Sequence, residues 1–402
     1  MQPHATAGTR AIAALAVTLA AGLCSVGAAD APSVAVRAGF AGGNVKVLKN
    51  APGVVHVAPD LRGDRAWFYW SFEAVADAPG RVRFVLPAKV AGHGGVGYQG
   101  PAISVDAGKT WRWMGAEDAN ANAFTVTFAR PGQAVRLAVT IPYVPADLER
   151  FLKAHAGSPH LTRTVLTRSR KGRAVPLLRV GAPAGGRRAL LVTCRHHACE
   201  TMASFVLEGL LAAALADTPA GRAFRRQCVL YAVPFVDRDG VEDGDQGKFR
   251  RPHDHNRDYG SGSIYPEVEA IEKLADEHNV RFLLDLHCPT LRYGDHQALY
   301  FVGPSNAPAA NLANIRRLAA LIKAALPPRA PVGPLVWLKE RPRMPTGSNC
   351  NRWFAYRPAT ILAATLEIPF APPKADVSRA NTRRIGAAIV DAWTKMELGP
   401  RK

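Results

Sequence analysis

Continuous apolar runs in the second half of the sequence constrain its fold more than any other feature. From about residue 160 onward these runs alternate with stretches of helical periodicity. A strand without polar alternation is covered on both faces, and its alternation with helices predicts an α/β sheet. The predicted strands are ALLVTC, CVLYAVPFV, VRFLLDLHC, ALYFVG and TILAATLEI. The predicted helices cover residues 200–216, 265–279, 308–326 and 378–396.

Residues 33 to about 145 follow a different pattern, in which apolar and polar residues alternate. In RVRFVLP the side chains of Val82, Phe84 and Leu86 share one face, and AFTVTFA and VRLAVTI repeat this alternation. Clusters of Gly, Asn and Pro separate the runs, which predicts a half-buried antiparallel β-sandwich. The stretch SVDAGKTW resembles an Asp-box hairpin, in which Asp106 and Gly108 provide the turn.

The length and composition indicate two globular domains. The chain has 402 residues, which exceeds one average domain, and its hydrophobic content of 48% is enough for a buried core. We therefore expect a β-sandwich domain over residues 33–150. An α/β domain should then follow over residues 155–400.

The N-terminus has the features of a signal peptide over residues 1–29. Arg10 supplies a positive charge, the apolar run of residues 11–23 follows, and small residues allow cleavage after Ala29 or Ala31. The run is too short to span a bilayer comfortably, and no later stretch is apolar enough for a transmembrane segment. We expect an exported protein that is periplasmic or secreted.

The charge and the cysteines limit the possible partners and cross-links. The net charge of +19 favours an anionic surface partner. There is no run of five basic residues and no basic stripe interleaved with aromatics, so we expect no specific nucleic-acid binding. Five of the six cysteines remain after removal of Cys24 with the signal, so at least one thiol lacks a partner within the chain. The pairing of the others stays open.

Polar side chains stand at the ends of three predicted strands. His197 and Glu200 follow ALLVTC, His287 ends VRFLLDL, and Glu367 lies near the end of TILAATLEI. Sites in α/β folds gather at the carboxyl ends of strands. Two imidazoles and a carboxylate form a catalytic zinc site with a fourth position for water, and a second carboxylate then serves as general base.

The order of four motifs, HACE, HNRDY, DLHCP and TLEIP, resembles the zinc carboxypeptidase family. The resemblance covers residues from about 160 to 396, beginning with the entry segment LTRSRKGRAVPLLRVG. WFYWSF and IPYVPADLERF resemble the N-terminal domain of the cytosolic carboxypeptidase subgroup. The resemblance implies a carboxypeptidase-like catalytic α/β domain with a mixed sheet, preceded by the antiparallel sandwich.

The resemblance also implies roles for individual residues. His197, Glu200 and His287 would bind one Zn²⁺ per chain. Glu367 would be the general base for water and then the proton donor to the leaving amine.

Further residues of HNRDY and its flanks would orient the ligands or bind the substrate. Asp254 would orient the first zinc histidine. Asn256 and Arg257 would hold a free carboxylate of a peptide-like substrate, and Arg257 would alternatively polarise the scissile carbonyl. Three basic residues compete for a second substrate-binding or oxyanion-stabilising role: Lys248, Arg250 and Arg251.

The sequence departs from the family pattern in places that concern specificity. VDRDG replaces the usual Asn-Pro-Asp-Gly turn, and Met344 stands near the place of a tyrosine that closes over the substrate. Tyr356 lies nearer to Glu367, and the specificity residue is expected near Asn349–Arg352. The leading hypothesis is a carboxypeptidase. The alternatives are a zinc amidohydrolase acting on cell-wall peptides or acyl amino acids, and a non-catalytic module that binds anionic polymers.

Overall fold

The computed structural model begins its described part after the predicted signal peptide. The described residues are 31–396, apart from 91–94, 98, 116, 118, 184–185, 261, 292–297, 303–307, 327–348 and 372–377. The predicted signal peptide of residues 1–29 and Met344 therefore lie outside the described residues.

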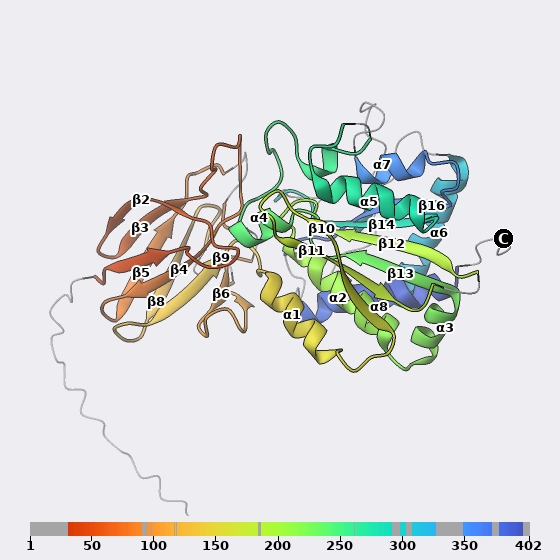
Figure 1. Ribbon diagram of the computed structural model, residues 1–402. Coiled ribbons are helices and arrows are strands. Elements are labelled where there is room, and N and C mark those ends of the chain that lie inside the picture. Colours follow the sequence, from red (N-terminus) through yellow and green to blue (C-terminus); the bar gives the residue numbers. More distant parts are fainter. Residues whose placement is uncertain are drawn as a thin grey trace, which may run out of the picture. The chain divides into compact units, whose positions relative to one another are not determined.

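Two sheets with facing apolar sides form the N-terminal part (Figure 1). One sheet has the order β1 (Val34–Arg37), β4 (Ser71–Ala76), β9 (Ala134–Ala138), β6 (Ala102–Ser104) and β7 (Arg112–Trp113). The other has the order β2 (Lys46–Ala51), β3 (Val54–Ala58), β5 (Gly80–Val85) and β8 (Ala123–Phe128). All neighbouring pairs are antiparallel except β3 and β5, which run parallel. The arrangement confirms the predicted antiparallel sandwich, with one parallel pair that the sequence did not indicate.

The predicted alternation of these strands produces the aromatic core between the sheets. Val82 and Phe84 of β5 are buried, whereas Arg81 before them and Arg83 between them are exposed. Phe72 of β4 reaches across to Phe84, with ring centroids 5.5 Å apart. Aromatic pairs at such distances add to the stabilisation from buried area alone. The two-residue period therefore identified the inner face correctly.

A seven-stranded mixed sheet forms the second part of the fold. Its order is β10 (Leu161–Arg168), β11 (Ala174–Val180), β13 (Cys228–Val233), β12 (Arg188–Cys194), β14 (Phe282–His287), β16 (Leu362–Glu367) and β15 (Tyr300–Val302). The four central strands, β13, β12, β14 and β16, are parallel, while the flanking strands are antiparallel to their neighbours. This arrangement confirms the predicted α/β class with a mixed sheet.

Helices cover both faces of the sheet, which explains why its central strands have no polar alternation. Leu190 and Val192 of β12 pack into the core shared with α2 (Thr201–Leu215) and α8 (Arg379–Thr394). Leu191 packs into the core shared with α5 (Pro266–Glu277) and α7 (Cys350–Ala355). Figure 1 shows α5 and α7 on one side of the sheet and α2 and α8 on the other. The other helical segments are α1 (Pro145–Ala154), α3 (Pro219–Gln227), α4 (Arg238–Asp243), η1 (His255–Arg257) and α6 (Ala309–Ala325).

Two glycines allow α2 and α8 to pack backbone against backbone. A Cβ atom on Gly209 would lie 1.9 Å from the carbonyl oxygen of Arg383, and one on Gly386 would lie 2.1 Å from that of Val206. Real Cβ atoms do not approach so closely, so any larger residue would push the helices apart. Close packing of these helices fixes α2, whose first residue follows Glu200.

The apolar core continues from the sandwich into the α/β part, and residues 31–402 form one compact unit. Tyr143, after β9, packs edge-on against Phe205 of α2 and donates a hydrogen bond of 2.8 Å to Glu208. The domain limits given by the sequence stay a prediction. Among the described helices, none is long and apolar enough to span a membrane alone, although α2 and α3, bent by 92°, meet that test together.

Candidate metal centre

Three parallel strands bring the predicted functional residues to one edge of the sheet. β12 and β14 pair with Cys194 opposite Leu286, and β14 and β16 pair with His287 opposite Glu367. All three strands therefore end at the same level, where the loop after β12 also begins. The strand ends meet, as the sequence predicted, because the three strands are parallel.

A strained turn directs the loop after β12 toward β14. Arg195 has a positive φ of 64°, which is unusual for a residue with a side chain. Its buried guanidinium holds the turn, because Nε donates to the carbonyl oxygen of Ala198 at 2.9 Å and Nη1 donates to Tyr143 O and Ser204 Oγ, both at 3.0 Å. The turn places His197 and the start of α2 beside β14.

The structure brings the three predicted ligands together. His197 Nδ1 lies 2.8 Å from Glu200 Oε1, and His287 Nδ1 lies 2.8 Å from Glu200 Oε2. One ligand atom from each of the three residues falls within 4.8 Å of the others, and all three side chains are buried. Two imidazole nitrogens and a carboxylate at this separation suit a tetrahedral zinc ion with an open position.

Carboxylates hold the other nitrogen of each histidine ring. Asp254 Oδ1 lies 3.4 Å from His197 Nε2, and Asp285 Oδ2 lies 2.8 Å from His287 Nε2. Such partners leave Nδ1 facing the metal and raise the basicity of the ring. Sequence reasoning named Asp254 but missed Asp285, although an acidic residue two positions before His287 within an apolar strand was a usable signal.

Asp285 also connects the ligands to His196. Asp285 Oδ1 lies 2.9 Å from His196 Nδ1, and the other ring nitrogen of His196 lies 2.7 Å from the hydroxyl of Tyr259. Thr193 donates a further hydrogen bond of 2.8 Å to the same carboxylate. His196, Asp285 and His287 form a second group with metal-ligand spacing, but it shares His287 with the first. We interpret it as a network that orients His287.

Burial and opposite charges act against each other on the ligands. Burial by itself raises the pKa of Glu200, but the neighbouring cations, Lys248 first among them, hold that pKa well below its usual value. Burial lowers the pKa of His197 and His287, yet the carboxylates around them raise both. A divalent cation would compete with protons for the same imidazole nitrogens, so metal binding here would release protons.

Glu367 lies beside the ligands without a full set of partners. Its side chain is half-buried, but Oε2 is shielded from solvent and has no hydrogen-bond partner among the described residues. Burial raises the pKa of Glu367, against the opposing effect of Lys248 and His287. A carboxylate with a raised pKa and an unused oxygen suits proton transfer to and from water near neutral pH.

The predicted substrate-binding residues take different positions. Asn256 is buried against the centre, with Nδ2 3.3 Å from His287 Nε2 and Oδ1 accepting from the amide of Cys350. Arg257 is exposed, and its Nη1 donates to Asn256 O. Arg250 pairs with Asp237 at 2.8 Å, so its guanidinium is held by this carboxylate.

Among the three competing basic residues, Lys248 reaches a ligand. Its Nζ lies 2.6 Å from Glu200 Oε1 and donates to the carbonyl oxygen of Cys288 at 2.7 Å. The side chain of Arg251 is exposed. Sequence reasoning could not choose between them, because all three fall within four positions of one loop.

Other residues discussed from the sequence surround the centre or lie apart from it. His255 is buried and stacks on Tyr265 at 3.7 Å between ring centroids, whereas His253 is half-buried and bonds Asp258. Tyr356 is exposed. Asn349 caps α7 through a hydrogen bond from the amide of Arg352.

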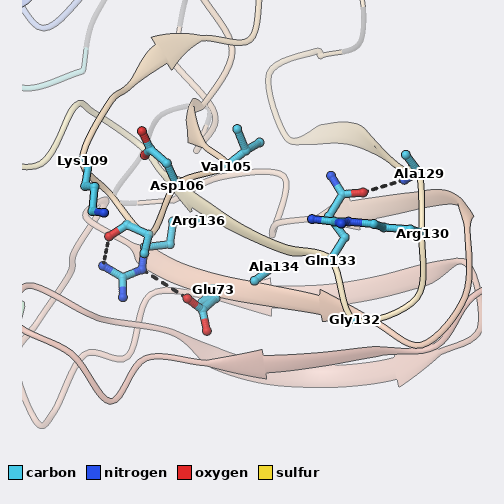
Figure 2. Close-up of a pocket in the computed structure, with 11 residues that line it drawn as sticks. Glu73, Val105, Asp106, Lys109, Ala129, Arg130, Gly132, Gln133, Ala134 and Arg136 are labelled. Carbon is cyan, nitrogen blue, oxygen red and sulfur yellow. Dashed lines mark hydrogen bonds and ion pairs between the residues drawn. The ribbon is translucent and has the colours of Figure 1, made fainter.

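A surface pocket of about 720 Å³ lies on the sandwich, away from the strand ends that carry the ligands (Figure 2). Its charged lining residues are Glu73, Asp106, Lys109, Arg130 and Arg136. Arg136 is bonded to Glu73, and the Asp106 carboxylate accepts hydrogen bonds from Thr110 within the predicted hairpin. The mixture of signs does not favour an anionic ligand over others.

The comparison with known proteins agrees with this geometry. The family described as "Zinc carboxypeptidase" matches residues 148–263, which include His197, Glu200 and the HNRDY motif. Cytosolic carboxypeptidase 2 of Danio rerio is 28% identical over 180 residues, which are 41% of this chain and 25% of that protein. The chain thus spans about a quarter of the length of this curated relative.

Solved structures share the fold over both parts of the chain. A metallo-carboxypeptidase from Burkholderia cenocepacia has a TM-score of 0.75 at 18% identity, covering 90% of this chain and 98% of that one. A metallo-carboxypeptidase from Pseudomonas aeruginosa, in complex with (2-guanidinoethylmercapto)succinic acid, has a TM-score of 0.74 at 22% identity and the same coverage. The chain is thus similar to zinc carboxypeptidases over residues 148–263, and it shares the fold of solved metallo-carboxypeptidases over 90% of its length.

Proposed function

We propose that the protein is an exported zinc-dependent carboxypeptidase that hydrolyses the C-terminal peptide bond of its substrate. One observation carries the proposal. His197, Glu200 and His287 converge at the strand ends with metal-ligand spacing, and the half-buried Glu367 lies at the same edge with an unused oxygen.

The donor set fits zinc rather than a harder cation. Two imidazole nitrogens and a single carboxylate match the preference of Zn²⁺, while Mg²⁺ and Ca²⁺ prefer oxygen ligands. Asp254 and Asp285 hold the outer ring nitrogens, as partners of zinc-binding histidines do. When bound, zinc would supply Lewis acidity, which polarises a carbonyl group and lowers the pKa of water.

The residues around this position would then transfer the proton and bind the substrate. Glu367 would accept the proton of the attacking water and pass it to the leaving amine. Desolvation raises its pKa, which strengthens it as a proton acceptor. Arg257 and Asn256 would hold the free carboxylate of a peptide-like substrate, because a planar guanidinium pairs with a carboxylate through two bonds.

A metal analysis tests the proposed centre directly. Purified wild-type protein should contain close to one zinc ion per chain, and His197→Ala should lose it because one of three ligands is removed. His160→Ala, an exposed histidine, is the matched control and should keep the metal. Absence of zinc from wild-type protein after refilling would contradict the proposal and favour a non-catalytic module for anionic polymers.

A second candidate is an amidohydrolase on the same scaffold, acting on cell-wall peptides or acyl amino acids. The departures from the family pattern, such as VDRDG at residues 236–240, support this alternative. Peptides with free and with amidated C-termini distinguish the two. A carboxypeptidase should cleave only the free form, and equal cleavage of both would exclude the exopeptidase assignment.

Export remains part of the proposal and rests on the sequence pattern of residues 1–29. The N-terminus of the protein isolated from its host should be Asp30 or Pro32 and should appear outside the cytoplasm. A mature chain that still begins at Met1 in the cytoplasm would contradict export without affecting the catalytic proposal.

A further inference from the structure

A short segment, Gln246–Lys248, lies across the two loops that carry the candidate ligands. We call these three residues the strap. The carbonyl oxygen of Gln246 accepts a hydrogen bond of 3.0 Å from the amide of Cys199, the residue before Glu200. At its other end, the Lys248 ammonium lies 2.6 Å from Glu200 Oε1 and donates to Cys288 O, next to His287. The strap therefore contacts the loops of two ligands.

The middle of the strap packs directly on the ligand loop. Gly247 has a φ of +82°, and a Cβ atom there would lie 2.6 Å from the amide nitrogen of Ala198 and 2.9 Å from the Cα of His197. Only glycine fits such a close approach of two backbones. Any displacement of the strap would consequently displace the backbone of His197 or open a gap beside it.

The opposite side of the strap is bonded to the sandwich. The buried side chain of Gln246 accepts hydrogen bonds from the amides of Phe68 and Tyr69, the latter at 3.1 Å, and donates to Ala66 O at 3.2 Å. Beside it, Arg62 binds Asp245 at 2.7 Å. The segment before β4 is thus bonded both to Asp245, which precedes the strap, and to Gln246 of the strap.

We propose that the strap is a positioning element through which the sandwich holds Glu200 and His287 in metal-binding geometry. Lys248 is the positioning residue that contacts the ligand, and Gln246 transmits the constraint from the sandwich. The proposal rests on the proposed function only in taking these side chains to bind zinc. It gives the sandwich a role in the centre itself, beyond covering one end of the α/β part.

The charge of Lys248 and its proposed positioning role predict opposite changes in zinc affinity when the ammonium group is removed. An ammonium group beside a Zn²⁺ ligand repels the metal, so its removal would strengthen zinc binding if charge were its whole effect. Removal of a positioning group weakens metal binding, typically 10- to 100-fold. The sign of the change in zinc affinity therefore decides between the two effects.

The first experiment measures the zinc dissociation constant by competition with a chromophoric chelator at fixed pH and ionic strength. Lys248→Met should bind zinc about 10-fold or more weakly than wild type. Lys248→Arg keeps the charge and the donors and should recover part of the affinity. Phe249→Ala, next in the chain and exposed, should match wild type. Equal or tighter zinc binding by Lys248→Met would overturn the positioning role.

The second experiment tests the link to the sandwich. Gln246→Leu removes the acceptor for Phe68 and Tyr69 but has no side-chain contact with a ligand in the structure, so weaker zinc binding would show transmission. Gln246→Glu keeps the acceptor for the two amides but loses the donor to Ala66 O. Its zinc affinity should therefore fall between those of Gln246→Leu and wild type. It decides the result if Gln246→Leu does not fold. Wild-type zinc affinity in folded Gln246→Leu or Gln246→Glu would overturn the coupling.

These outcomes separate the strap from the proposed activity. If wild-type protein binds zinc in a strap-dependent manner but cleaves no peptide, the catalytic proposal fails and the strap stands. If peptides are cleaved while every strap variant keeps wild-type zinc affinity, the strap fails and the catalytic proposal stands.

Discussion

At the scale of the residue, Glu367 combines two properties that seldom occur together in a protein core. It is a half-buried carboxyl group whose Oε2 is shielded from solvent and bonds no described residue, and it lies opposite His287 in the sheet. Desolvation of such a group is costly unless a ligand or a metal offsets it. A purely structural role would not explain why this cost is retained at the strand end.

The test of Glu367 is its replacement by the isosteric glutamine. Glu367→Gln should lower kcat by about 10²- to 10⁴-fold, because the proton acceptor is lost while shape is kept. Zinc content should stay at the wild-type level, since Glu367 is not among the ligands. Hydrolysis at the wild-type rate, measured with a peptide substrate, would show that another group accepts the proton.

At the scale of the element, α5 carries a buried acid on its first turn. Glu267 is 1% exposed, and His255 Nε2 lies 3.9 Å from its Oε2. Burial raises the pKa of Glu267 from 4.5 to about 7, with Asp237 and Asp239 adding to the shift and Arg250 opposing it. In the folded chain the Glu267 carboxyl group thus keeps its proton at pH values where the unfolded chain would release it.

This buried acid predicts how stability depends on pH. Between about pH 4.5 and 7 the folded chain binds more protons at Glu267 than the unfolded chain, so its contribution to stability declines as the pH rises. Glu267→Gln should remove that decline and stabilise the protein by about 1–3 kcal/mol at pH 8. Urea unfolding at pH 5 and pH 8 measures this. Glu269→Gln, exposed on the same turn, should show no such gain.

At the scale of the whole molecule, the core contains five cysteines and no disulfide among the described residues. Cys194, Cys199, Cys228, Cys288 and Cys350 are all buried, and none of them forms a disulfide with another described residue. The odd count required at least one thiol outside any disulfide within the chain, and the structure places all five outside one. Burial raises the pKa of Cys199 and Cys288, which keeps these thiols in their unreactive form.

The thiols give a prediction for the intact protein. Native protein should react slowly with Ellman's reagent, whereas protein unfolded in urea without reductant should release five thiols per mature chain. The absorbance of the released thiolate measures both. A count of three or one after unfolding would reveal disulfides and contradict the free thiols of the structure.

Local patterns determined the larger part of this fold. The helices predicted at residues 200–216 and 378–396 correspond to α2 and α8 within two residues at each end. The period of the apolar residues indicates which faces of a strand are buried. Burial of both faces implies parallel strands with helices between them. The convergence of His197, His287 and Glu367 then follows, because the ends of parallel strands share one edge.

Tertiary structure alone decided which polar groups meet. No local pattern indicates that Lys248 contacts Glu200 while Arg250 turns to Asp237, because each pair forms across a loop. The parallel pairing of β3 and β5 in the sandwich was likewise invisible, since alternation reports the buried face but not strand direction. Periodicity is a property of neighbours in the chain, whereas an ion pair or a strand partner depends on where distant segments come to lie.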